Sequence, residues 1–124
     1  MNSSDIHIAV KTQYLPEQSK PAQRQFAFAY QITIANLGPE SAQLMARHWV
    51  IADAHDKTQE VRGIGVVGEQ PCIEPGQSYR YTSGVMLGTE HGTMTGSYQM
   101  QDSAGAEFDA IIPLFVLAVP GTMH

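Results

Sequence analysis

The sequence has little charge, and most of that charge is acidic. Of its 124 residues, 15% are charged and 43% are hydrophobic, with 7 Lys and Arg against 12 Asp and Glu for a formal net charge of −5. An average soluble domain is about 25% charged, so the composition excludes a disordered, charge-extended chain. Phosphate contacts need clustered Lys and Arg, whereas the basic residues are scattered here, so no nucleic-acid partner is expected.

Cysteine is nearly absent, and the histidines are not spaced as metal ligands. The one cysteine, Cys72, excludes a disulfide within the chain and any CxxC motif. No base stands near it in the sequence to form a thiolate, so we expect Cys72 to be a small buried apolar residue. The five histidines show no HxH or HxxxH pair. A zinc or cobalt site would have to be assembled from distant strands, and we predict no metal and no other cofactor.

No long apolar run is present. The longest, 110–119, is interrupted by Pro113 and is too short for a bilayer, which needs about 20 residues. The first eleven residues have neither the basic start nor the apolar core of a signal peptide. We therefore expect a cytoplasmic protein without membrane insertion, and the unpaired Cys72 agrees with a reducing compartment.

Hydrophobicity with period two dominates what is present. The clearest strand places five large apolar residues on one face: Phe26, Phe28, Tyr30, Ile32 and Ile34. Further strands are expected over 6–14, 60–67, 79–85, 93–100 and 107–119, with turn residues between them. About seven or more strands and no convincing long helix predict a single all-β domain over residues 1–124, an antiparallel sandwich or barrel. An exposed sheet edge leaves monomer and homodimer both open.

Residues 42–53 fit two patterns equally well. A strand would alternate through Leu44, Ala46, Val50 and Ala52. A helix capped by Ser41 would gather Ala42, Met45, Ala46, Trp49 and Val50 on one face. Periodicity alone leaves both open, although Trp49 should be largely buried in either case.

A literal GxGxxG stands at 63–68, but its context is not that of a nucleotide site. In a dinucleotide-binding unit, a helix follows the glycines and supplies a positive field to the pyrophosphate. Here Pro71 and Pro75 follow closely, and no Walker lysine is present. We interpret the glycines as a strand end and turn. The candidate binding segment comprises Gly63, Gly65, Gly68, Glu69, Gln70 and Pro71.

The sequence offers no recognisable catalytic constellation. It lacks GxSxG, and the serines and histidines form no triad by spacing. The aromatic residues follow the period of a sheet, which favours a core over a ligand-stacking surface. No catalytic residue is predicted, and we expect the protein not to be an enzyme.

Several ordered motifs resemble the bacterial ApaG family, also called CorD. They are VRGIGVVGEQP at 61–71, PGQSYRYTSG at 75–84, GTMTGSYQM at 92–100 and IPLFVLAVP at 112–120. FAY at 28–30 and RHWVI at 47–51 resemble the family's second and third strands. The resemblance spans essentially the whole chain. It implies a fibronectin type III-like β-sandwich and assigns residues 42–53 to a strand.

The same resemblance implies a function only in outline. Bacterial members are associated with cobalt and magnesium efflux, and a similar domain is appended to eukaryotic F-box proteins, which is typical of protein-interaction modules. The expectation is therefore a non-enzymatic module that binds an unknown partner protein, with the segment 63–71 and adjacent loops as the candidate contact surface. The alternatives are a nucleotide or pyrophosphate bound at that segment, or a divalent-metal sensor or chaperone.

Overall fold

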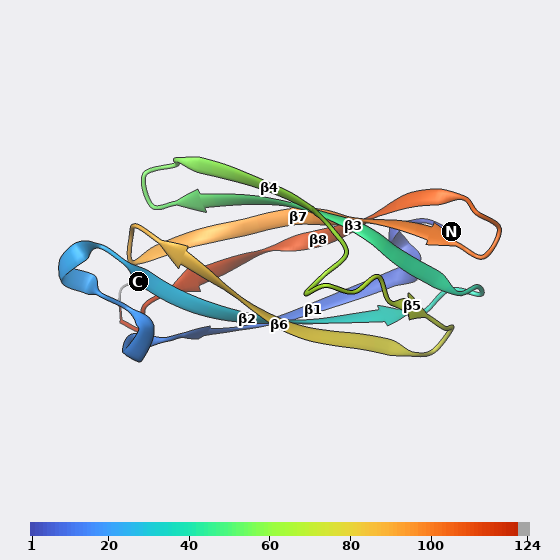
Figure 1. Ribbon diagram of the computed structural model, residues 1–124, viewed down its shortest axis with the longest axis horizontal. Coiled ribbons are helices and arrows are strands. Elements are labelled where there is room, and N and C mark those ends of the chain that lie inside the picture. Colours follow the sequence, from blue (N-terminus) through green and yellow to red (C-terminus); the bar gives the residue numbers. More distant parts are fainter. Residues whose placement is uncertain (122–124) are drawn as a thin grey trace.

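The computed structural model describes residues 1–121 and shows two antiparallel sheets packed face to face (Figure 1). One sheet has three strands in the order β1-β2-β6, and the other has five, in the order β4-β3-β7-β8 with β5 paired to β3. The strands are β1 (Ile6–Tyr14), β2 (Phe26–Asn36), β3 (Ala42–Asp53), β4 (Thr58–Ile64), β5 (Cys72–Ile73), β6 (Ser78–Leu87), β7 (His91–Asp102) and β8 (Glu107–Ala118). This confirms the predicted fold class, a fibronectin type III-like sandwich.

Short helical turns complete the chain. Residues 1–121 contain three 3-10 turns of three residues each, η1 (Ser3–Asp5), η2 (Pro16–Gln18) and η3 (Pro21–Gln23). The second and third lie in the connection between β1 and β2. Among residues 1–121, no helix has the length and apolarity to cross a membrane.

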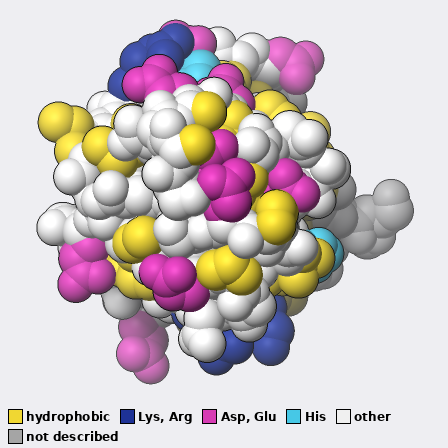
Figure 2. All heavy atoms as spheres, turned by 90° about the vertical axis from the view of Figure 1, so that its right-hand side faces the viewer, with side chains coloured by type: hydrophobic (Ala, Val, Ile, Leu, Met, Phe, Trp, Pro, Cys, Tyr) yellow, Lys and Arg dark blue, Asp and Glu magenta, His cyan; other side chains and the backbone are white. Residues whose placement is uncertain are grey.

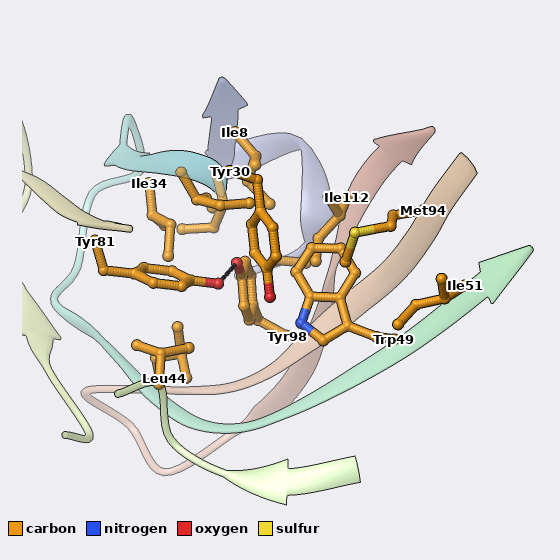
Figure 3. Packing of buried hydrophobic residues seen from close by; sticks show 14 of the residues in the cluster. Ile8, Tyr30, Ile34, Leu44, Trp49, Ile51, Tyr81, Met94, Tyr98 and Ile112 are labelled. Atoms are coloured by element: carbon orange, nitrogen blue, oxygen red, sulfur yellow. Dashed lines mark hydrogen bonds between the residues drawn. The ribbon is translucent and has the colours of Figure 1, made fainter. Parts of the chain in front are cut away.

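The core lies between the sheets and is centred on Trp49, which is 2% exposed (Figure 3). The predicted face of β2 is buried throughout, from Phe26 to Ile34. The indole of Trp49 packs edge-on against Tyr30 at 5.5 Å, Tyr98 at 6.2 Å and Phe115 at 5.8 Å between ring centroids. Such edge-to-face pairs each add about 0.5–1.5 kcal/mol beyond area burial.

Two tyrosines from opposite sheets are hydrogen-bonded to each other in this core. The hydroxyls of Tyr81 on β6 and Tyr98 on β7 share a buried hydrogen bond, drawn as a dashed line in Figure 3. Burial raises the pKa of both phenols above the ordinary tyrosine value. The pair therefore stays protonated and ties the two sheets together with a polar contact.

A bulge at Met45 resolves the ambiguity over residues 42–53. The β3–β7 register steps from Leu44 paired with Met100 to Ala46 paired with Gln99, so Met45 is the extra residue. The bulge changes which residues face the other sheet, from 42 and 44 before it to 47, 49 and 51 after it. The segment is a strand and Trp49 is buried, as predicted. The single alternating face expected through Ala46, Val50 and Ala52 was wrong, because it assumed unbroken period two.

The prediction that Cys72 is buried was also wrong. Cys72 is exposed, whereas its neighbour Ile73 is 3% exposed. The two residues form the whole of β5, and only one of two consecutive strand residues can face the core. Ile73 takes that position, so Cys72 points outward.

Hydrogen bonds of two polar side chains, Asn36 and Asp102, hold one end of the sandwich together. The buried Asn36 side chain donates to the carbonyls of Glu40 at 2.8 Å and Ile73 at 2.9 Å. Asp102 accepts from the Met1 amine at 2.9 Å and from the backbone amides of Ala104 and Ala106 at 3.0 Å each. These contacts bind the loops to the strand ends where water is largely excluded.

Candidate functional site

The GxGxxG segment forms a tight two-residue hairpin. The amide of Val66 donates to the carbonyl of Glu69 at 2.8 Å, and the amide of Glu69 donates back to the carbonyl of Val66 at 2.9 Å. The residues between them, Val67 and Gly68, have φ angles of 43° and 82°. Positive φ at both central positions defines a type I′ turn. No helix follows, which agrees with the sequence-based interpretation of a strand end and turn.

The three glycines of the motif are required for different reasons. Gly65 has φ +63°, and a Cβ there would collide with the backbone carbonyl of Glu69. Gly68 supplies the second positive φ of the turn, with nothing within 4 Å of its missing Cβ. Gly63 has no positive φ, but a Cβ there would lie 2.7 Å from the guanidinium carbon of Arg47. The motif therefore shapes a turn and leaves space for an arginine.

The remaining residues of the candidate segment fasten the hairpin to both sheets. Glu69 accepts a hydrogen bond from the Tyr79 hydroxyl of β6 at 2.8 Å. Gln70 donates to the carbonyl of Met45 at 3.0 Å, and the carbonyl of Pro71 accepts from the amide of Leu44 at 2.9 Å. The Met45 bulge thus provides an acceptor for the hairpin. The structure brings all six predicted residues into one hydrogen-bonded element.

Two apolar side chains project from this element. Ile64, at the end of β4, is 77% exposed, and Val67, in the turn, is 57% exposed. Each would lose contact with water on binding a partner, whereas neither contributes to the core. They form, with the turn between them, the surface that we call the hairpin knob (Ile64–Gly68).

A groove opens beside the hairpin knob, between the edge strands β4 and β6. It has a volume of about 400 Å³ and continues into a hollow of about 160 Å³ that reaches Val66 and Val67. The two share four lining residues, Tyr30, Arg47, Trp49 and Ser83. We call this space the β4–β6 groove. Its other walls are mostly apolar: Ile51, Val61, Val85, Met86 and Met94.

Arg47 is the one charged residue that lines the groove among the described residues. The Met45 bulge brings it to the inner face of β3, two residues before Trp49. One guanidinium nitrogen, Nη1, donates to the carbonyls of Ile64 at 3.2 Å and Gly65 at 2.8 Å. Within residues 1–121, no carboxylate lies within salt-bridge distance of it. The geometry therefore presents an arginine held by its own fold and open to an acceptor.

The sequence predicted a strand end and turn at the glycine motif but missed the groove. Arg47 stood in the apolar stretch LMARHWVI, and unbroken alternation would have placed it on the outer face. A lone arginine two residues before the only tryptophan was the available signal. The bulge that turns both inward leaves no mark that periodicity can detect.

Histidine, cysteine and acidic side chains do not gather elsewhere. Within residues 1–121 no group of three or more is placed to hold a metal ion. Figure 2 views the end of the molecule opposite the β3–β4 turn, where acidic and apolar side chains are interspersed and Lys and Arg lie near the top and bottom of the view.

The two packed antiparallel sheets define a domain of the fibronectin type III-like β-sandwich class. Residues 16–102 match the family described as the ApaG domain. Protein ApaG of Pseudomonas paraeruginosa is 60% identical over 119 residues, which cover 96% of this chain and 94% of that one. The chain therefore belongs to the ApaG family.

Solved structures agree with this assignment. A crystal structure from Bordetella pertussis, described as an ApaA protein, superposes with a TM-score of 0.92 at 47% identity and covers 95% of this chain and 96% of that one. An X-ray structure of a structural-genomics target gives a TM-score of 0.93 at 49% identity, covering 98% and 92%. At this similarity both the fold and the family are shared.

Proposed function

We propose that this chain is a non-enzymatic, cytoplasmic module that binds a partner protein through the hairpin knob and the adjoining groove. The carrying observation is Val67, a β-branched residue at φ 43° whose side chain is 57% exposed. Such a backbone costs on the order of 1 kcal/mol or more, and Val67 is not a member of the hydrophobic core. Strain retained at an exposed apolar side chain supports a contact role.

The alternative, a nucleotide or pyrophosphate cradled by the backbone of the segment, has less support. A phosphate cradle needs free amides. The amides of Gly65, Val66 and Glu69 already donate to carbonyls of the protein, at 2.9 Å, 2.8 Å and 2.9 Å. The carboxylate of Glu69 adds a negative charge where an anion would sit. A role in cobalt and magnesium efflux, as sensor, chaperone or accessory protein, would on this proposal act through the partner.

One substitution separates binding from folding. Val67→Asn creates the Asn-Gly pair that type I′ turns favour, so it should stabilise the fold by roughly 0.5–1 kcal/mol while removing the apolar contact. Leu114→Asn on β8 is the matched control, because Leu114 is 60% exposed and β8 is the strand farthest from β4 in its sheet.

Affinity capture from a Pseudomonas paraeruginosa lysate, quantified by mass spectrometry, measures the difference. We expect proteins that wild type and Leu114→Asn retain and that Val67→Asn loses. Equal capture by all three would remove the hairpin knob from the contact surface.

The purified protein should also not hydrolyse dinucleoside polyphosphates. Turnover lost on substitution of a single carboxylate would show an enzyme instead.

A further inference from the structure

The β4–β6 groove contains hydrogen-bond donors without acceptors. Within residues 1–121, the hydroxyl of Tyr30, the indole nitrogen of Trp49 and the hydroxyl of Ser83 make no hydrogen bond, nor do Nε and Nη2 of Arg47. Tyr30 is 7% exposed and Trp49 is 2% exposed. None of these donor atoms is among the buried unpaired atoms of residues 1–121, so each is open to the solvent of the groove and free to donate to an acceptor from outside the chain.

The donors converge from both sheets. Tyr30 on β2 and Ser83 on β6 are directly opposite each other in register, while Arg47 and Trp49 lie two residues apart on the inner face of β3. Figure 3 shows the Tyr30 hydroxyl and the Trp49 indole nitrogen directed toward the same space. The ring centroids of these two residues are 5.5 Å apart. An oxygen acceptor placed there would meet several donors at once.

The charge of the groove selects an acid with a single negative charge. Arg47 is the one cation lining it and no described acidic residue lines it, so a carboxylate is matched one to one. A carboxylate accepts a forked guanidinium in a charge-assisted pair. A pyrophosphate would bring several charges to one arginine in a chain of net charge −5. The apolar walls would leave those charges without partners.

The shape of the groove selects an extended peptide. Its walls include Gln59 and Val61 of β4 and residues 83–86 of β6. Among the described residues each of these strands pairs with one neighbour, which leaves its other edge of backbone donors and acceptors unpaired by any described strand. An added strand can use such an edge while its alternate side chains enter the pocket. The Met and Val side chains of the groove then suit apolar residues on either side of the acid.

We propose, building on the protein-binding function above, that the β4–β6 groove takes an extended segment of the partner, and that Arg47, Tyr30, Trp49 and Ser83 bind one carboxylate on it. Gly63 serves the same site, because only a glycine there leaves room for the guanidinium. Arg47 is the specificity-determining residue, and the apolar walls set the flanking side chains.

Selection from a random 12-residue peptide display library tests this directly. Wild type should enrich peptides with an Asp, a Glu or a free terminal carboxylate between apolar residues. Arg47→Gln should not enrich them. Arg62→Gln, an exposed arginine on β4 with no hydrogen bond among the described residues, is the charge-matched control and should enrich the same peptides as wild type. Melting curves confirm that all three are folded.

Titration of the best peptide then measures the pairing, with Trp49 as the reporter because the chain has one tryptophan. Replacing the acidic residue by its amide should weaken binding at least tenfold in wild type and by less than twofold in Arg47→Gln. Enrichment of neutral peptides, equal binding to Arg47→Gln or no enrichment would each overturn the proposal. Saturation by inorganic pyrophosphate at micromolar concentration would do so too, and would assign the groove to a phosphoryl ligand.

The two proposals fail separately. If the library test fails while partner capture still depends on Val67, the module binds by its hairpin knob and the groove has another role. If capture is also independent of Val67, the proposed function itself is wrong.

Discussion

The guanidinium of Arg47 lies over the Cα of Gly63, its partner in the β3–β4 register. This contact connects the glycine motif at 63–68 with the β4–β6 groove. Nothing in the sequence links Arg47 to that motif. The contact also predicts that the glycines of one motif respond differently to the same substitution.

Gly65→Ala should lower the free energy of unfolding by well over 1 kcal/mol, because the new Cβ meets positive φ and the Glu69 carbonyl together. Gly68→Ala meets only positive φ and should cost about 1 kcal/mol. Gly63→Ala meets the end of a flexible side chain and should fold almost as wild type does. Urea unfolding of the three variants checks the order. A Gly63→Ala variant as unstable as Gly65→Ala would contradict this account.

The buried tyrosine pair should behave as a unit. Tyr98→Phe leaves the Tyr81 hydroxyl without its partner and should cost about 1–3 kcal/mol, whereas changing both to Phe should cost less than the sum of the single changes. A double-mutant cycle in urea measures the coupling, and strict additivity would show that the hydroxyls do not interact.

The same pair gives an alkaline limit to stability. Burial raises the pKa of both phenols in the folded state above the value of 10.0. The folded state therefore holds protons that the unfolded chain releases, so stability is fully present below about pH 10 and falls above it. The double Phe variant should show a shallower fall. Unfolding midpoints at pH 8 to 11 compare the two proteins.

Protonation of Asp102 should lower the stability of the fold at acidic pH. Its hydrogen bond from the Met1 amine, and further bonds from Ala106 and Ala104, hold the pKa of its carboxyl below 3.8. A depressed carboxyl pKa stabilises the fold above the unfolded value, and that contribution is lost as pH falls through the folded value. Asp102→Asn should therefore be less stable than wild type at pH 7, with the difference shrinking toward pH 3. A constant difference across that range would rule out this linkage.

Metal removal should leave the fold unchanged. The core and the paired polar groups explain the stability of the sandwich without coordination of a metal ion. Melting curves with and without EDTA should coincide, and adding cobalt should not raise the midpoint. A fall of many degrees on chelation would show that distant histidines form a site in solution.

The strands were predictable because most of them have one solvent-exposed face and one buried face. The face of β2 from Phe26 to Ile34 and the turn at Gly68 follow from local rules, since alternation and positive φ are properties of neighbouring residues. Residues 72–73 were not predicted as a strand, because two residues are too few to show a period. Their pairing with Ala42 and Gln43 is long-range.

The groove was not predictable for a related reason. Its donors come from three strands, and only the packing of the two sheets brings Tyr30 of β2 near Arg47 of β3. The family resemblance supplied the fold of residues 42–53, but it carried no information on which side of the strand Arg47 would face.

The bulge at Met45 lets β3 carry one residue more than the stretch of β7 that it pairs with. Met45 contributes mainly its carbonyl, which accepts from Gly65 at 2.9 Å and from Gln70 at 3.0 Å, so many side chains would serve there. Deleting that one residue would make Leu44 and Ala46 consecutive, opposite the consecutive Met100 and Gln99, so Trp49 would keep facing the core. The hairpin would instead lose its two hydrogen bonds to the Met45 carbonyl. The extra residue of β3 therefore serves to fasten the hairpin, and its deletion should loosen residues 64–71 more than it disturbs the core.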